Sequence, residues 1–148
     1  MSNKRSKATI DTIVGECIAV RMRMLNRVVT NIYDEALRPL GVKVSQMNIL
    51  VAAGKAEAAR PAEISQRLHL DVSTLSRNVE RMKARGWLEV IPDQDGRAQP
   101  FRLTTQGRKL LEKALPAWKE AQQKANAILG DQIVDQLSAA IGRLNIDT

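Results

Sequence analysis

The segment of residues 61–86 constrains the fold of this chain more than any other, because its pattern predicts two helices joined by a tight turn. Its sequence is PAEISQRLHLDVSTLSRNVERMKARG. Pro61 suits the first position of a helix, where a missing N–H costs nothing, and Gly86 suits the end of one. His69 falls in the expected turn, and Asp71 is placed to cap the second helix. The segment is therefore predicted to form a helix-turn-helix.

The second helix, expected over residues 71–85, carries two faces of different chemistry. Its apolar residues recur at three- and four-residue steps, so they line one stripe that faces a core. The stripe consists of Val72, Leu75, Val79 and Met82. Arg77 lies opposite this stripe, and hydroxyl and guanidinium groups on that side can bind base edges and phosphates of double-stranded DNA. An ordinary solvated helix surface is the alternative interpretation.

Length and composition predict one soluble globular domain. A chain of 148 residues with 44% apolar residues can bury a real core. A formal charge of +7 favours a polyanion or an acidic surface as partner. A single cysteine excludes an intrachain disulfide, and no apolar run reaches the length of a membrane span, so a reducing cytoplasm is the expected location. Aromatic residues make up only 3%, which argues against binding of single-stranded nucleic acid.

Residues 10–37 are predicted to form one long helix, preceded by a mobile tail over residues 1–8. Two apolar stripes run along this helix, and a small domain can cover only one of them. The first stripe consists of Val14, Ile18, Leu25, Val28 and Ile32, and the second of Ile10, Ile13, Cys17, Val20 and Met24. One stripe is therefore expected to face the core and the other a partner subunit. Pro39 and Gly41 end the helix.

Further helices and a hairpin are expected on both sides of the helix-turn-helix. Ser45 is placed to cap a helix that reaches about Ala53. Residues 87–91 and 101–103 predict two short strands around an Asp-Gly turn. Pro100 cannot donate a ladder hydrogen bond, so the hairpin is expected at a sheet edge.

The C-terminal part of the chain, residues 104–146, predicts two more helices. Thr104 is a good N-cap for the first of them. Pro116 should kink this helix because it lacks an N–H, and Gly130 should separate it from a last amphipathic helix.

A helix-turn-helix followed at once by a charged hairpin is typical of a winged helix. The predicted fold class is mainly α (α+β): a winged helix-turn-helix over residues 45–103 with long helices on both sides. Arg97, at the tip of the wing over residues 92–100, can enter the narrow minor groove of DNA. An ordinary surface turn is the alternative, and Asp93 and Asp95 oppose a purely electrostatic role.

With these elements the chain resembles the MarR family of bacterial transcription regulators. The matching residues are Leu68, Ser73-Thr74-Leu75-Ser76-Arg77 and Gly86 in the helix-turn-helix, Asp93-x-Asp95-x-Arg97 in the wing, and Leu103-Thr104-x-x-Gly107 after it. The order of elements also matches, over residues 10–145. Family members often carry consecutive arginines in the wing, whereas this chain has Gly96-Arg97-Ala98, which implies a weaker grip on the minor groove.

The resemblance implies one MarR-like domain over residues 1–148 and an obligate homodimer joined by the helices at 10–37 and 104–146. Such proteins usually repress transcription from pseudo-palindromic operators, and a phenolic or other apolar small molecule, or an oxidant, releases them. The helix at 71–85 would lie in the major groove and the wing at 92–100 in the minor groove. The DNA-contacting residues implied are Ser73, Thr74, Ser76, Arg77, Asn78, Arg81 and Arg97. Half-sites about 10 bp apart are the geometric expectation for a symmetric dimer.

Cys17 and His69 are the other candidates for chemistry. One branch of the family senses hydroperoxides with a cysteine in this helix, so an oxidant sensor through Cys17 is an alternative function. A structural role is favoured, because Cys17 lies on an apolar stripe and Tyr33 would lie about 24 Å away along the same helix. His69 is expected to pack in the turn rather than to report pH or touch a ligand.

Two further function classes compete with a DNA-binding regulator. A winged helix that binds an acidic protein is one, and the salt dependence of binding to duplex DNA would distinguish it. An enzyme is the other, but one histidine, one cysteine and no metal-spaced cluster offer no nucleophile–base pair. The sequence therefore predicts a bacterial, cytoplasmic DNA-binding regulator that is not an enzyme and needs no cofactor or metal.

Overall fold

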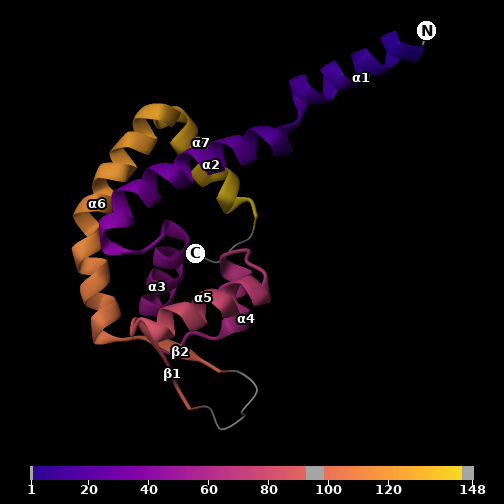
Figure 1. Ribbon diagram of the computed structural model, residues 1–148. Coiled ribbons are helices and arrows are strands. Elements are labelled where there is room, and N and C mark those ends of the chain that lie inside the picture. Colours follow the sequence, from indigo (N-terminus) through magenta and orange to yellow (C-terminus); the bar gives the residue numbers. More distant parts are fainter. Residues whose placement is uncertain (1, 93–98, 145–148) are drawn as a thin grey trace.

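Helices form most of the molecule, and two short strands form a single hairpin (Figure 1). The computed structural model describes residues 2–92 and 99–144. In chain order the elements are α1 (Ser2–Glu16), α2 (Ile18–Leu37), the 3-10 turn η1 (Arg38–Leu40), α3 (Val44–Lys55), α4 (Pro61–Arg67), α5 (Val72–Ala84), β1 (Leu88–Val90), β2 (Phe101–Leu103), α6 (Thr105–Leu129) and α7 (Asp131–Gly142). The predicted fold class, mainly α with a small antiparallel sheet, is confirmed.

The hydrophobic core lies where α3, α4, α5 and the hairpin meet the start of α6. Its largest fully buried side chains are Phe101, Leu37, Ile49, Leu50, Leu75 and Met82. Each side chain of this size contributes about 1.5–3 kcal/mol when it leaves water. The winged helix therefore has a core of its own, to which α2 contributes mainly through its C-terminal residue Leu37.

The hairpin is antiparallel, and a third segment extends it. Leu88 pairs with Leu103, and Val90 with Phe101. Ala59, before α4, exchanges two backbone hydrogen bonds with Phe101, with N···O distances of 2.8 and 3.0 Å. This bridge covers the outer edge of β2, which the sequence pattern did not predict.

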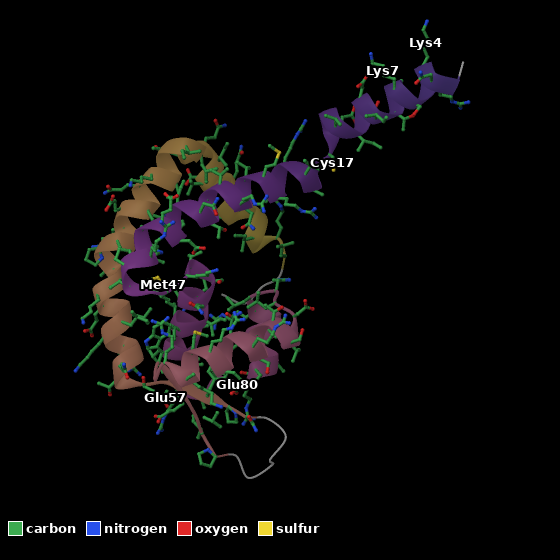
Figure 2. All side chains as sticks on the ribbon, in the orientation of Figure 1. Lys4, Lys7, Cys17, Met47, Glu57 and Glu80 are labelled. Atoms are coloured by element: carbon green, nitrogen blue, oxygen red, sulfur yellow. The ribbon has the colours of Figure 1, made fainter. Side chains whose placement is uncertain are left out.

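The N-terminal prediction of a tail over residues 1–8 and one helix over 10–37 is wrong. A helix, α1, begins at Ser2 and projects from the rest of the molecule (Figure 1). The chain is extended at Cys17, with φ −66° and ψ 108°, so α2 starts as a separate helix. The side chain of Arg21 donates a hydrogen bond to the carbonyl of Gly15 and satisfies one of the open acceptors at the end of α1. Figure 2 shows Cys17 at this junction.

A side chain from α2, rather than Ser45, holds the start of α3. The helix begins two residues earlier than predicted, at Val44 instead of Gln46, with Lys43 as the N-cap residue. Asp34 accepts a hydrogen bond from the backbone N–H of Val44 at 2.8 Å, and Gln46 accepts one from that of Lys43 at 3.1 Å. A partner ten residues away in sequence has replaced the local cap that the pattern suggested.

The long helix α6 connects the hairpin to α7. Thr104 caps it as predicted, since its hydroxyl accepts a hydrogen bond from the N–H of Gly107 at 3.0 Å. The helix continues through Pro116 and is curved in Figure 1. Gly130, with φ +81°, separates it from α7 as expected.

The helices α2 and α6 lie against each other beyond the winged helix. The ring of Tyr33 lies 6.4 Å from that of Trp118, centroid to centroid, and its hydroxyl donates a hydrogen bond to the side-chain oxygen of Gln122. Burial raises the pKa of the Tyr33 hydroxyl above its ordinary value of 10.0. Across residues 2–92 and 99–144, no helix has both the length and the apolar character of a membrane span.

Candidate nucleic-acid interface

The turn between α4 and α5 is fixed by hydrogen bonds within the backbone and by one buried serine. The N–H of Leu70 donates to the carbonyl of Ser65 at 2.9 Å, and the Ser65 hydroxyl donates back to the carbonyl of Leu70. His69, between them, has a left-handed backbone with φ +50°, which histidine tolerates better than most residues. Its ring is exposed, so the backbone of His69, not its side chain, shapes the turn.

One side of α5 is anchored in the core, largely as the sequence pattern predicts. Leu75, Val79 and Met82 are buried. Val72, the first residue of the helix, is 63% exposed, so the buried stripe begins one turn later than predicted. Asp71 occupies the N-cap position, but its side chain makes no capping hydrogen bond. Packing of the stripe, rather than the cap, therefore holds α5 in place.

The opposite side of α5 carries six of the seven predicted DNA-contacting residues. Ser73, Ser76, Arg77 and Arg81 are exposed. Thr74 and Asn78 are half-buried, and the Asn78 side-chain amide donates to the Thr74 carbonyl at 3.0 Å. This bond orients Asn78, and no described residue is recorded as donating to its side-chain oxygen, which can accept a hydrogen bond.

The arginines on this face are available for a partner outside the chain. Glu80, the acidic residue on α5, pairs with Lys83 at 2.9 Å. Among the described residues, Arg77 and Arg81 have no acidic partner. The exposed side of α5 is therefore rich in hydroxyl groups near its N-terminus and positively charged behind them.

Arg85, in contrast, is used inside the molecule. Its guanidinium lies 4.2 Å from the centroid of the Trp87 ring and donates to the carbonyl of Gly41 at 2.8 Å. This contact ties the end of α5 to the loop before α3. An arginine in the same charged run thus has a structural role that spacing alone does not reveal.

The hairpin leaves the body beside α5, as the position of a wing requires (Figure 1). The N–H of Trp87 donates to the carbonyl of Met82 at 3.0 Å, which couples the start of the hairpin to α5. Glu89 and Arg102 pair at 2.6 Å on the outer face. The predicted minor-groove residue, Arg97, lies outside the described residues. So do Asp93, Asp95, Gly96 and Ala98.

Catalytic or metal chemistry finds no support in the part of the chain that the structure describes. There, no three histidine, cysteine, aspartate or glutamate residues lie close enough to hold a metal ion. Cys17 is half-buried at the helix junction. Tyr33 packs on Trp118. The feature that stands out among the described residues is the exposed, positively charged face of α5.

Comparison with known proteins identifies the fold. A family model described as MarR family matches residues 40–98, which include the whole helix-turn-helix. The transcriptional regulator MosR from M. tuberculosis, solved in complex with DNA, is 32% identical; the match covers 87% of this chain and 96% of that one, with a TM-score of 0.76. The chain belongs to the MarR family.

Two further proteins show how far the similarity extends in sequence and in fold. The multiple antibiotic resistance protein MarR from Escherichia coli (strain K12) is 29% identical over 92 residues, which are 62% of this chain and 64% of that protein. The match thus spans less than two thirds of its length. CouR from Rhodococcus jostii RHA1, solved with p-coumaroyl-CoA bound, shares the fold at a TM-score of 0.75 and 21% identity, over 90% of this chain and 95% of that one. MarR-family proteins are transcriptional regulators and not enzymes, as was predicted for this chain.

Proposed function

We propose that this MarR-family protein is a homodimeric repressor that binds a pseudo-palindromic operator, with α5 in the major groove and residues 92–100 at the minor groove. One observation carries the proposal: the exposed face of α5 bears Arg77 and Arg81, which have no acidic partner among residues 2–92 and 99–144, directly opposite a stripe that anchors the helix in the core. A helix held on one side can insert its other side into a groove without rearrangement. The relative MosR was solved in complex with DNA, which supports this assignment.

The exposed residues of α5 divide into two groups by reach. Ser73 and Ser76, near the N-terminus of the helix, have short side chains suited to base edges or to the nearest phosphates. Arg77 can reach a guanine with two hydrogen bonds, and Arg81, one turn later, can bind a phosphate. Thr74 and the side-chain oxygen of Asn78 complete the proposed set on α5. Arg97 is proposed for the minor groove on sequence grounds.

A homodimer is proposed because α1, α2 and α7 expose apolar side chains that a monomer would leave in water. These are Ile10, Ile13, Val14, Ile18, Val20, Met22, Met24, Leu25 and Val28 on α1 and α2, and Ile133 and Ile141 on α7. A two-fold dimer would cover such a surface and would present two copies of α5 to half-sites about 10 bp apart. A small apolar or phenolic effector is proposed to release the DNA, as the ligand-bound relative CouR suggests. The setting would be a bacterial cytoplasm.

The test is binding to duplex DNA from the region that flanks the protein's own gene. Footprinting should show a protected site, and fluorescence anisotropy should show specific binding with an affinity that falls steeply as salt rises, because phosphate contacts release counterions. Arg77→Ala should weaken specific binding, while Lys113→Ala, which removes the same charge from α6, should not. Equal affinity for operator and scrambled duplex, without a salt dependence, would favour the acidic-protein partner instead.

A further inference from the structure

Val72, the first residue of α5, presents an apolar side chain to solvent on the helix proposed to lie in the major groove. The helical spacing placed Val72 in the buried stripe of α5, but 63% of its surface is exposed. Leu75, three residues later in that stripe, is completely buried. The fold therefore leaves the methyl groups of Val72 outside the core, at the end of α5 that follows the turn after α4.

The position of Val72 on α5 matches that of residues already proposed to contact DNA. Ser73 is its neighbour, Ser76 lies one turn further along the same side of the helix, and both are exposed. Side chains on a helix lean toward its N-terminus, so the Val72 methyl groups point beyond the first turn. In helix-turn-helix proteins, the N-terminal residues of the second helix are those that reach base edges. Val72 therefore lies where a base contact is expected.

Asp71, directly before Val72, indicates that this end of α5 faces base edges rather than phosphates. The Asp71 side chain is exposed and makes no capping hydrogen bond, and no described residue forms an ion pair with it. Phosphates repel an unpaired carboxylate, whereas the amino group of cytosine can donate a hydrogen bond to one. An approach that places Asp71 and Val72 over the bases avoids this repulsion.

Valine can distinguish bases in the major groove only through apolar contact. The C5-methyl group of thymine is the apolar group in the pattern that the four bases present there. Contact between this group and the methyl groups of Val72 would remove apolar surface of both partners from water. Cytosine in the same place would present its amino group to a side chain that cannot accept a hydrogen bond. Val72 is therefore suited to a thymine and not to a cytosine.

We propose that Val72 is a specificity-determining residue that selects a thymine in each half-site by contact with the C5-methyl group. This inference rests on the proposed function, because it requires α5 to lie in the major groove. It adds a different kind of contact to that function. The residues proposed above act through hydrogen bonds and charge, whereas Val72 acts through apolar contact alone.

Deoxyuridine provides the test, because its base differs from thymine only in the absence of the C5-methyl group. Each thymine of the footprinted operator is replaced in turn, at the same place in both half-sites, and binding of the full-length protein is measured by fluorescence anisotropy. At one position the replacement should weaken binding by about fourfold per half-site, or about fifteenfold in all, as expected for one methyl group lost from an apolar contact. Val72→Ala should lose about as much affinity for the unmodified operator and show no further loss with deoxyuridine at that position.

Val51→Ala on α3 is the matched control, because it removes the same two methyl groups from a valine that is 45% exposed and lies outside α5. This variant should respond to deoxyuridine as the parent protein does. Circular dichroism should show the same helix content for Val72→Ala and the parent protein, because the Val72 side chain lies outside the core.

The outcomes separate this proposal from the proposed function. If deoxyuridine weakens binding at no position, or weakens binding of Val72→Ala as much as that of the parent protein at every position, Val72 does not contact a thymine methyl group and the proposal is overturned. The proposed function would stand in that case if Arg77→Ala still weakened operator binding. An equal loss of affinity by Val72→Ala for operator and scrambled duplex would also overturn the proposal, because the contact would then select no base. Absence of specific binding by the parent protein would overturn both.

Discussion

The close approach of α6 to the start of the hairpin makes Gly107→Ala a sharp test of the fold. A Cβ at position 107 would lie 2.7 Å from the Leu103 side chain and closer still to the backbone oxygen of Trp87. That oxygen cannot move freely, because it accepts the hydrogen bond from the Thr104 N–H at 3.1 Å that joins the hairpin to α6. The added methyl group must therefore push the two elements apart.

The change in stability caused by Gly107→Ala is the balance of two destabilising contributions and one stabilising contribution. Overpacking of a well-filled site costs about 1–3 kcal/mol, and loss of the Thr104–Trp87 hydrogen bond adds about 0.5–1.5 kcal/mol. Alanine stabilises a helix interior by about 0.8–1.0 kcal/mol relative to glycine, which offsets part of this loss. Gly107→Ala should therefore lower the free energy of unfolding by about 0.5–3.7 kcal/mol, although helix propensity alone predicts a gain.

Urea unfolding, followed by circular dichroism at several fixed protein concentrations, measures this difference. Gly142→Ala in α7 is the matched control, because no atom lies within 4 Å of the Cβ it would add. The control should be as stable as the parent protein or up to about 1 kcal/mol more stable, because alanine favours the helix more than glycine does. If Gly107→Ala matches the control or is more stable, the contact between α6 and Trp87 is not as described and the reasoning is refuted.

Three further predictions address the proposed function, and a fourth addresses the burial of Tyr33. Arg77→Ala should weaken the free energy of DNA binding by about 1–3 kcal/mol at operators that carry the base Arg77 contacts. Arg97→Ala should weaken binding at most sequences and lower the salt dependence of log K by about one unit. Titration of operator and scrambled duplex with each variant measures both effects. Light scattering at micromolar concentration should give twice the monomer mass of 16.4 kDa, and a clean monomer would contradict the two-half-site picture. Peroxide should have no effect on operator binding by the parent protein or by Cys17→Ser; release of the parent alone would make the protein an oxidant sensor. Absorbance titration of Tyr33, the only tyrosine, should give a midpoint above pH 10.0. Because the pKa is raised in the folded state, the neutral hydroxyl should contribute stability below the unfolded pKa. This stability should be lost as the pH rises through the folded pKa.

Local patterns in the sequence were sufficient for the elements that short-range physics determines. The three-and-four spacing of Leu75, Val79 and Met82 predicted the buried side of α5, and with it the exposed side that carries Arg77. The hydroxyl of Thr104 was recognised as a cap because its partner lies three residues away. Four of the predicted contact residues on α5 are exposed, which follows from the same helical period.

Contacts between residues far apart in sequence explain most of the structural features that the sequence did not predict. The break at Cys17 was hidden because the apolar spacing continues through it without a proline. The cap of α3 comes from Asp34 on α2, and the edge of β2 is covered by Ala59. The brace formed by Arg85 on Trp87 likewise depends on where the fold places both residues. No local pattern contains that information.

The helix α6 is long enough that a small tilt at one end produces a large displacement at the other. Its 25 residues, at a rise of 1.5 Å each, measure about 37 Å along the helix. Thr104 and Gly107 clamp one end to the hairpin, while the other end leads into α7. A tilt of about 5° at the α7 end displaces the clamped end by about 3 Å. That distance is close to the axial step of about 3.4 Å between base pairs. In the proposed homodimer, a small rotation between the two subunits would therefore be enough to move each α5 out of register with its proposed half-site.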